Sequence, residues 1–153
     1  MSYSISRVNW QQAAPLLKDI RERVFICERR IPKKVEFDCQ DASAFHMLVC
    51  DDFTQEPVAT GRLLPSGELG RIAVVMDHRK RKIDKLVIKG LISIAKEIDI
   101  DEVFINSPLD SVSYFSKRHF YSVGTVFMEA GRPKQRMACL VNEVTYNKFY
   151  LGH

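Results

Sequence analysis

Residues 70–96 read G-R-I-A-V-V-M-D-H-R-K-R-K-I-D-K-L-V-I-K-G-L-I-S-I-A-K. Residues 72–76 form a short apolar run rich in β-branched side chains, which is typical of a buried strand. From Ile83 to Ile98 the apolar residues recur at the spacing that places them on one face of a helix. Between these two patterns lies a polar turn, residues 77–82. The stretch therefore predicts a buried strand, a tight turn and an amphipathic helix.

The turn ends in four consecutive cations, Arg79, Lys80, Arg81 and Lys82, which we call the basic turn. A helix that begins directly after such a turn presents backbone amides without helical partners, and these favour an anionic ligand. The alternative is a solvated turn that only connects two core elements. The local pattern leaves both interpretations open.

On both sides of this stretch, apolar residues that alternate with polar ones predict strands, and apolar residues at helical spacing predict helices. A helix is expected to begin at Asn9, as its N-cap, and to end before Pro32. Residues 65–68 are a strong turn signal, so the strands on either side are expected to pair as an antiparallel hairpin. Further strands are expected near residues 3–8, 45–50, 58–64, 103–105, 121–128 and 135–144, with a short helix over residues 110–118. The order β-α-β-β-β-α-β-α-β-β predicts a layered α/β or α+β fold around one mixed sheet.

The composition is that of an ordinary globular protein. The chain has 153 residues, 46% of them hydrophobic and 27% charged, and a net charge of +4. This mild positive charge suits a small acidic ligand and does not by itself imply nucleic acid. The four cysteines show no C-x-x-C spacing, so free thiols and no metal site are expected. Without a signal peptide or a membrane-spanning apolar run, the expected location is cytoplasmic.

Six motifs follow one another in an order and spacing that resemble the GNAT (N-acetyltransferase) superfamily, in particular its small bacterial members. They are R-E-R-V-F-I-C-E-R-R-I-P (21–32), E-F-D-C-Q-D-A-S-A-F-H (36–46), V-A-T-G-R-L-L-P-S-G-E-L-G-R-I-A-V (58–74), V-F-I-N-S (103–107), Y-F-S-K-R-H-F (114–120) and E-A-G-R-P-K-Q-R-M (129–137).

The resemblance covers nearly the whole chain. It implies one acyltransferase domain over residues 1–145, with a C-terminal tail over residues 146–153. The implied fold is a mixed, mostly antiparallel central sheet flanked by helices. The implied activity is transfer of an acetyl group from acetyl-CoA to an amine.

The resemblance also implies which residues bind the cofactor. In such proteins the strand at residues 71–75 splays from its neighbour and its backbone binds the pantetheine arm, and the following turn wraps the pyrophosphate. A side-chain amide at the end of the next central strand lies near the cofactor. Carried onto this chain, the cofactor-binding residues are Ile72, Ala73, Val74, Val75, Arg79, Lys80, Arg81, Lys82 and Asn106.

The basic turn departs from the family pattern Arg/Gln-x-x-Gly-x-Gly/Ala. Residues 79–84 read R-K-R-K-I-D, so that Lys82 and Asp84 stand at the two glycine positions. Glycine allows close approach of the backbone to phosphate and a positive φ. Asp84 would repel a pyrophosphate, or would lie harmlessly in the first helical turn. The cations either replace the lost amide contacts with side-chain contacts, or acetyl-CoA binding is weakened or absent.

The catalytic positions also depart from the family. Phe115 stands where related enzymes have a tyrosine that protonates the leaving thiolate, and Tyr114, one residue away, is the remaining candidate acid. Its alternative role is core packing. Lys134 stands where small bacterial members often have a histidine. Other candidate bases are Glu28, Glu36 and His46. The predicted catalytic residues are Glu36, Tyr114 and Asn106.

Two functions follow from these patterns. The first is an acetyl-CoA-dependent N-acyltransferase acting on the amine of a small molecule or a protein, without a metal. The alternative is a catalytically inactive, GNAT-like regulatory module that binds an anionic ligand or partner through the basic turn, residues 79–82. Membrane and nucleic-acid partners are not expected. The aromatic residues of the tail are compatible with a homodimer.

Overall fold

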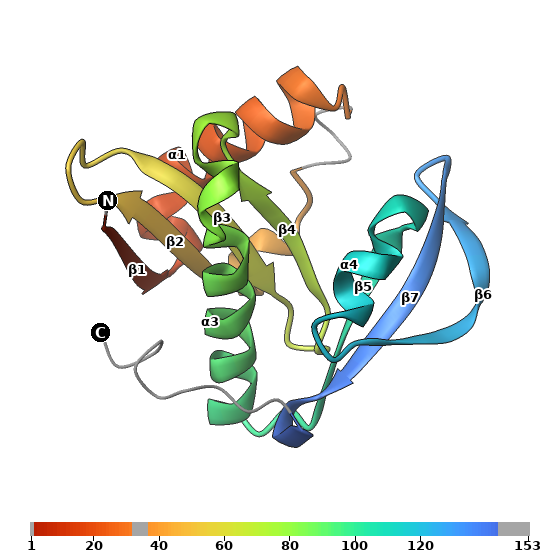
Figure 1. Cartoon of the computed structure of the whole chain (residues 1–153). Helices are drawn as coiled ribbons and strands as arrows, with labels where there is room; N and C mark the ends of the chain where they lie inside the picture. The colour runs from red at the N-terminus through yellow and green to blue at the C-terminus, as the bar shows by residue number, and fades with distance from the viewer. Residues whose placement is uncertain (1, 32–36, 144–153) are drawn as a thin grey trace.

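The computed structural model describes residues 2–31 and 37–143 (Figure 1). The elements follow the order expected from the sequence: β1 (Tyr3–Val8), α1 (Trp10–Arg21), the π-helix η1 (Glu22–Glu28), the 3-10 turn η2 (Asp41–Ser43), β2 (Phe45–Asp51), β3 (Pro57–Leu63), β4 (Leu69–Val74), the 3-10 helix η3 (Met76–Arg81), α3 (Ile83–Glu97), β5 (Glu102–Pro108), the 3-10 turn η4 (Leu109–Ser111), α4 (Val112–Ser116), β6 (Tyr121–Glu129), β7 (Arg132–Leu140) and the 3-10 turn η5 (Val141–Glu143).

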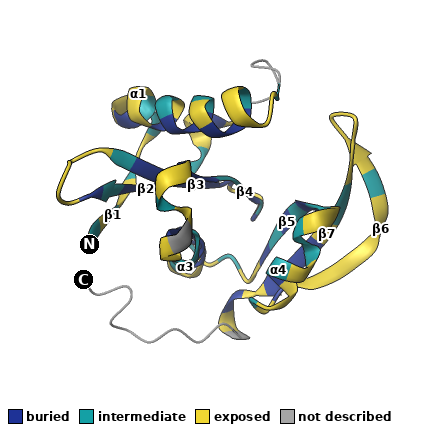
Figure 2. Ribbon diagram, turned by 45° about the horizontal axis from the view of Figure 1, so that its top comes forward, coloured by how far each residue is buried: buried dark blue, intermediate teal, exposed yellow. Residues whose placement is uncertain are grey.

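The first sheet is antiparallel, in the order β1-β2-β3-β4. Helices α1 and α3 lie on opposite faces of it (Figure 2). Because both faces are covered, β2 and β3 are buried along nearly their whole length. Helix α3 packs so closely that a Cβ atom at Gly61 would lie 2.5 Å from Cγ1 of Val87. Glycine at this position therefore lets the helix approach the sheet.

The second sheet is also antiparallel, in the order β5-β7-β6. Among the described residues, one bridge in parallel orientation, between Glu68 and Phe104, connects the two sheets. Beyond this bridge β4 and β5 run apart (Figure 1). The predicted mixed, mostly antiparallel sheet flanked by helices is confirmed. The structure divides it into two sheets where β4 leaves β5.

Strand β4 contains a bulge close to this division. Thr60 pairs with Ala73 and Arg62 with Gly70, so that Arg71 and Ile72 together face the single residue Gly61. Arg71 has a φ of +50°, the left-handed conformation that such a bulge often needs. A bulge bends its strand and redirects the side chains around it. The bend occurs where β4 begins to run apart from β5.

The first helix begins where the sequence predicted, whereas strand β4 ends earlier than predicted. Oδ1 of Asn9 accepts a hydrogen bond from the backbone N–H of Gln12 at 2.9 Å, which confirms the N-cap. Strand β4 ends at Val74, and Met76, predicted in the buried strand, is 64% exposed in η3. Strand β7 begins at Arg132, three residues earlier than expected, because its first residues pair with β6. The predicted tail, residues 146–153, lies outside the described residues.

Candidate functional site

A cavity of about 470 Å³ opens between β4 and β5, and we call it the cleft. It is bounded by η1, by β4, by the first turn of α3, by β5, by α4 and by the β6–β7 hairpin. Five of the predicted catalytic and cofactor-binding residues line it: Ile72, Val74, Arg79, Asn106 and Tyr114. The splayed strands expected from the resemblance thus enclose an open space, and the residue at the second glycine position, Asp84, lines it without filling it.

The backbone of β4 alternates between β3 and the cleft. Ile72 and Val74 line the cleft. Ala73 is buried and is paired with Thr60, and the N–H of Val75 donates to the carbonyl of Val58 at 2.9 Å. Four residues at the end of β4 and directly after it, Ile72–Val75, were predicted to bind the cofactor. The structure brings Ile72 and Val74 to the cleft, and turns the amide of Val75 toward β3.

Arg79 closes one edge of the cleft. Its Nε donates to the carbonyl oxygen of Val74 at 2.9 Å. Its Nη2 donates to both carboxylate oxygens of Glu28, at 2.6 and 2.7 Å. The guanidinium therefore connects η1 to the end of β4. An incoming phosphate would compete with Glu28 for this cation, because charge-assisted pairs of Arg with phosphate and with carboxylate have the same geometry.

The other cations of the basic turn lie along the start of α3. Arg79, Lys80 and Arg81 belong to η3, and Lys82 is the N-cap of α3. Lys82 has φ 58° and ψ 30°, which is the left-handed conformation. Glycine adopts this conformation without strain, so its use at this position in related turns has a direct conformational reason. The side chains of Arg81 and Lys82 are exposed and do not line the cleft.

Asp84 and Tyr114 meet inside the cleft. The Tyr114 hydroxyl donates a hydrogen bond to the Asp84 carboxylate, and both residues line the cavity. Burial raises the pKa of Tyr114, and the Asp84 carboxylate raises it further. Phe115, which stands at the family's tyrosine position, is buried in the core. Tyr114 is therefore the phenol that reaches the cleft. Asp84 lies in the first turn of α3 and also accepts the hydrogen bond from this phenol.

Asn106 lies on the opposite wall of the cleft. Its Nδ2 donates to Oε2 of Glu129 at 3.1 Å, and its Oδ1 accepts from Nε of Arg136 at 3.2 Å. Asn106 and Arg136 are cross-strand partners on β5 and β7. The amide is thus held in one orientation by two neighbours on the second sheet.

A second cavity of about 300 Å³ adjoins the cleft, and we call it the hairpin cavity because the β6–β7 turn lines it. The two cavities share six lining residues: Ile31, Glu68, Arg71, Glu129, Arg132 and Lys134. The two cavities therefore adjoin along these residues, and Glu68 lies where they meet.

Glu68 is a functional candidate that the sequence analysis did not identify. Burial raises the pKa of Glu68, and the nearby Glu129 carboxylate raises it further. In the sequence Glu68 follows Pro-Ser-Gly, and this pattern predicts only a turn residue. Its position becomes evident only from the bridge to Phe104, which is 36 residues further along the chain. No local signal could have found it.

No family model matches the sequence. A protein of Bacillus subtilis (strain 168) named "uncharacterized N-acetyltransferase YjcF" is 30% identical over 129 residues, which are 79% of this chain and 90% of that protein. The chain belongs to the GNAT superfamily of N-acetyltransferases.

Solved structures share the GNAT fold. An acyl-CoA N-acyltransferase from Pseudomonas aeruginosa has a TM-score of 0.79 and 20% identity, and the match covers 90% of this chain and 99% of that one. Escherichia coli ElaA has a TM-score of 0.78 and 20% identity, with the same coverage. At this level of identity the likeness establishes the fold.

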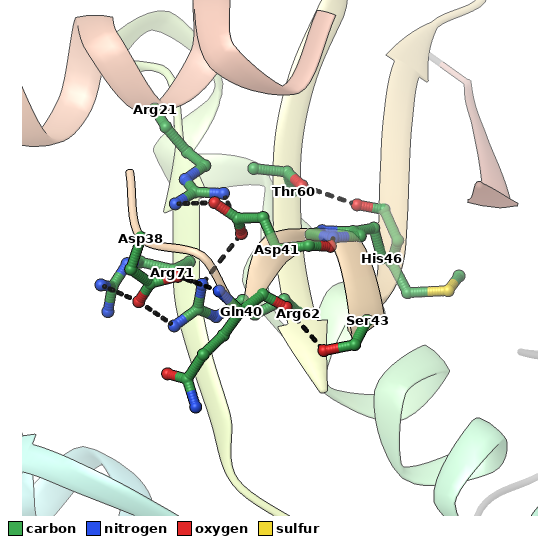
Figure 3. Close-up of polar contacts among 10 residues, drawn as sticks. Arg21, Asp38, Gln40, Asp41, Ser43, His46, Thr60, Arg62 and Arg71 are labelled. Atoms are coloured by element: carbon green, nitrogen blue, oxygen red, sulfur yellow. Dashed lines mark hydrogen bonds and ion pairs between the residues drawn. The ribbon is translucent and has the colours of Figure 1, made fainter. Parts of the chain in front are cut away.

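Beside the hairpin cavity, a network of ion pairs fixes the loop that precedes β2 (Figure 3). Nη1 of Arg21 lies 2.8 Å from Oδ1 of Asp41, and both side chains are almost fully buried. Arg62 binds Asp41 at 2.9 Å and Asp38 at 2.8 Å, and Arg71 reaches Asp38 at 3.2 Å. The hydrogen bond from Arg62 holds the pKa of Asp38 below its usual range. The loop is thereby attached to α1, β3 and β4.

The sequence suggested three other candidate bases for this GNAT domain, His46, Glu28 and Glu36. The first two have hydrogen-bond or ion-pair partners outside the interior of the cleft, and the third is not described. His46 is buried against Trp10 and its Nε2 lies 2.9 Å from the Asp41 carbonyl, and burial lowers its pKa. It lines neither cavity. Glu28 is paired with Arg79. Glu36 lies outside the described residues, so its role stays a prediction.

No group of three or more His, Cys, Asp or Glu in residues 2–31 and 37–143 is placed to hold a metal ion. Over the same residues, none of the helices is long and apolar enough to cross a membrane.

Proposed function

We propose that this protein is an N-acyltransferase that transfers an acetyl group from acetyl-CoA to an amine. The observation that carries the proposal is the open cleft between β4 and β5, which joins Arg79 at one end to Glu68 at the other. Membership of the superfamily supports the reaction class, while the cofactor and the acceptor are inferred from the lining side chains.

The pantetheine arm would lie along β4. Ile72 and Val74 line the cleft, and the Val74 carbonyl, which accepts from Arg79, is suited to an amide of the arm. For this the Val74 carbonyl must lose its hydrogen bond with Arg79. The freed guanidinium is then available to the diphosphate, with Arg81 and Lys82 nearby. Cofactor binding is thus expected to involve an exchange of partners at Arg79.

The acceptor amine would approach through the hairpin cavity. Its nitrogen attacks the thioester carbonyl carbon, so that a C–N bond forms and the C–S bond breaks. The Glu68 carboxylate accepts the proton that the nitrogen loses. A raised pKa makes this carboxylate a better base near neutral pH, provided that it remains ionised. Asn106 and Tyr114 are proposed to orient the reacting groups, and so is Glu36, which lies outside the described residues.

Tyr114 is proposed to stabilise the leaving thiolate of CoA. Its hydroxyl now donates to Asp84, and its raised pKa opposes full loss of the proton to a thiolate, which is the weaker base. We therefore assign Tyr114 a hydrogen bond to the developing thiolate instead of the complete proton transfer expected from the resemblance.

A binding module without transfer is the second candidate, and one observation favours it. Arg79, the residue retained from the family turn, is already engaged by Glu28 and by Val74. An anionic partner that displaced Glu28 would bind there with no need of a reaction.

The test combines binding and turnover. Isothermal titration of acetyl-CoA at low salt should show binding, and thiol release should follow when amines are added. Glu68→Gln is expected to lower kcat by at least about 100-fold, the usual contribution of a general base. The matched control is Glu56→Gln, at an exposed position in the β2–β3 turn. Absence of acetyl-CoA binding at millimolar concentration would overturn the proposal and leave the binding module.

A further inference from the structure

We propose that the acceptor is a small amine that carries a carboxylate within a few bonds of its nitrogen, as an amino acid does. This inference rests on the proposed acyl transfer and deepens it. The size and the lining charges of the hairpin cavity suit such an amine.

The size of the hairpin cavity limits the acceptor. At about 300 Å³ it is at the small end of the cavities that hold ligands. It is bounded by the start of β4, by the β6–β7 turn and by Asp38 and Gln40 of the loop that the ion-pair network holds in place. This volume suits a small molecule and not a broad protein surface.

Two acids, Glu68 and Glu129, line the hairpin cavity. Their carboxylates are close enough to interact electrostatically, since Glu129 contributes to the raised pKa of Glu68. Glu129 also accepts a hydrogen bond from Asn106 on the cleft side. An amine or ammonium group placed between them would be next to the thioester position in the cleft.

Cations line the hairpin cavity beside these acids. They are Arg132, Lys134 and Arg71, and Arg132 is the cross-strand partner of Glu129. Burial lowers the pKa of Lys134, and the cations of Arg132, Arg71 and Arg29 lower it further, against the opposing effect of Glu129. In the part of the chain that the structure describes, no ion pair involves Arg132 or Lys134, although Arg132 donates a long hydrogen bond, 3.4 Å, to the Arg29 carbonyl. A bound anion would relieve this crowding of positive charge.

The acids of the neighbouring loop do not provide that anion. Asp38 is bound by Arg62 and Arg71, and Asp41 is bound by Arg21 and Arg62. They are therefore already matched by cations of the network. Arg132 and Lys134 remain for a ligand.

The charge balance favours a single carboxylate. Among the residues that the structure describes, the charged lining residues of the hairpin cavity are four cations and three acids: Arg62, Arg71, Arg132, Lys134, Asp38, Glu68 and Glu129. One formal positive charge is left over, and an acceptor with a neutral, reactive amine and one carboxylate balances it. A polyamine or a lysine-rich peptide would place a second cation against Lys134 and Arg132, which is unfavourable.

The experiment compares amino acids with the amines that lack only the carboxylate. Thiol release from acetyl-CoA is measured for a panel of pairs, such as phenylalanine with 2-phenylethylamine and lysine with 1,5-diaminopentane. For the pair whose amino acid reacts best, we expect kcat/KM to be at least about ten-fold higher for the amino acid than for its amine. The amine lacks the carboxylate and with it one charge-assisted contact with the lining cations.

Variants locate the effect. Lys134→Gln and Arg132→Gln should raise KM for the amino acid and leave KM for its decarboxylated partner nearly unchanged. Lys117→Gln, at an exposed position at the end of α4, is the control and should change neither. Titration of the N-acetyl amino acid product, compared with the corresponding N-acetyl amine, gives a readout that does not depend on turnover.

The outcomes are distinguishable. If acetyl-CoA binds and the decarboxylated amines react as well as the amino acids or better, the acceptor inference is wrong and the proposed function stands. The inference is equally wrong if neither class reacts and the N-acetyl amino acid does not bind. If acetyl-CoA itself does not bind, the proposed function fails and the acceptor inference fails with it.

Discussion

The Tyr114 hydroxyl donates a hydrogen bond to the Asp84 carboxylate within the cleft between β4 and β5. This contact joins α4 to the first turn of α3. It places a negative charge where the related turns have glycine, at the helix end that would face the diphosphate of acetyl-CoA. The contact therefore supports the local structure while opposing the cofactor.

Asp84→Asn is expected to tighten acetyl-CoA binding about two- to five-fold. The substitution removes one negative charge at the start of a helix, an effect of about 0.3–1 kcal/mol. The asparagine side chain can still accept a hydrogen bond from Tyr114. Isothermal titration at low salt measures the change, and Asp101→Asn, an exposed position before β5, is the control. Weaker binding in Asp84→Asn would show that the carboxylate helps to hold the cofactor.

The ion pair between Arg79 and Glu28 gives a second prediction, with opposite effects for its two members. Arg79→Gln should weaken acetyl-CoA binding by about ten-fold or more, because a charge-assisted hydrogen bond is lost. Glu28→Gln should strengthen acetyl-CoA binding about two- to three-fold, because it removes the carboxylate that competes with the diphosphate for Arg79. The size of the effect is that of a partly exposed ion pair. Titration at two salt concentrations checks both.

Glu97→Gln, which breaks an exposed ion pair with Arg7, is the control for Glu28→Gln and should leave the affinity unchanged. If Arg79→Gln binds acetyl-CoA as tightly as the parent protein, then Arg79 does not contact the diphosphate, and its bonds to Glu28 and Val74 persist in the complex.

Glu68 gives a prediction about the pH dependence of stability. Burial and Glu129 raise its pKa, so the folded protein holds this proton more tightly than the unfolded chain does. The free energy of unfolding therefore falls as pH rises through the window above the ordinary glutamate pKa. Glu68→Gln has no such proton and should have a higher Tm than the parent protein at about pH 8, with the difference shrinking toward about pH 3.5. Thermal unfolding across this range measures it, and a difference independent of pH would contradict the raised pKa.

The elements of the fold could be predicted because their signals are local. The apolar period that begins at Ile83 and the capping oxygen of Asn9 each act within a few residues, and both appear in the structure as expected. The end of β4 was less predictable. Val75 and Met76 continue the apolar run, yet the strand ends at Val74, because the chain turns into η3 where its pairing with β3 ends.

The candidate site was predictable only in part, because several of its features depend on residues far apart in the sequence. The resemblance indicated Asn106 and Tyr114, and both line the cleft. No local pattern connects Arg21 with Asp41, twenty residues later, although their buried ion pair fixes one wall of the hairpin cavity. Glu68 was missed for the same reason.

The last prediction concerns the packing that holds the first sheet against α3. Gly61→Ala should lower the free energy of unfolding by about 1–3 kcal/mol, because its Cβ would lie 2.5 Å from Cγ1 of Val87 and 3.0 Å from Cδ1 of Leu91. Gly70→Ala is the matched control, since a Cβ there meets no atom within 4 Å and its φ is not positive. Denaturant unfolding of both variants measures the difference. Equal stability of the two would mean that α3 can shift away from β3 at little cost, and the helix would then no longer fix the position of Asp84 in the cleft.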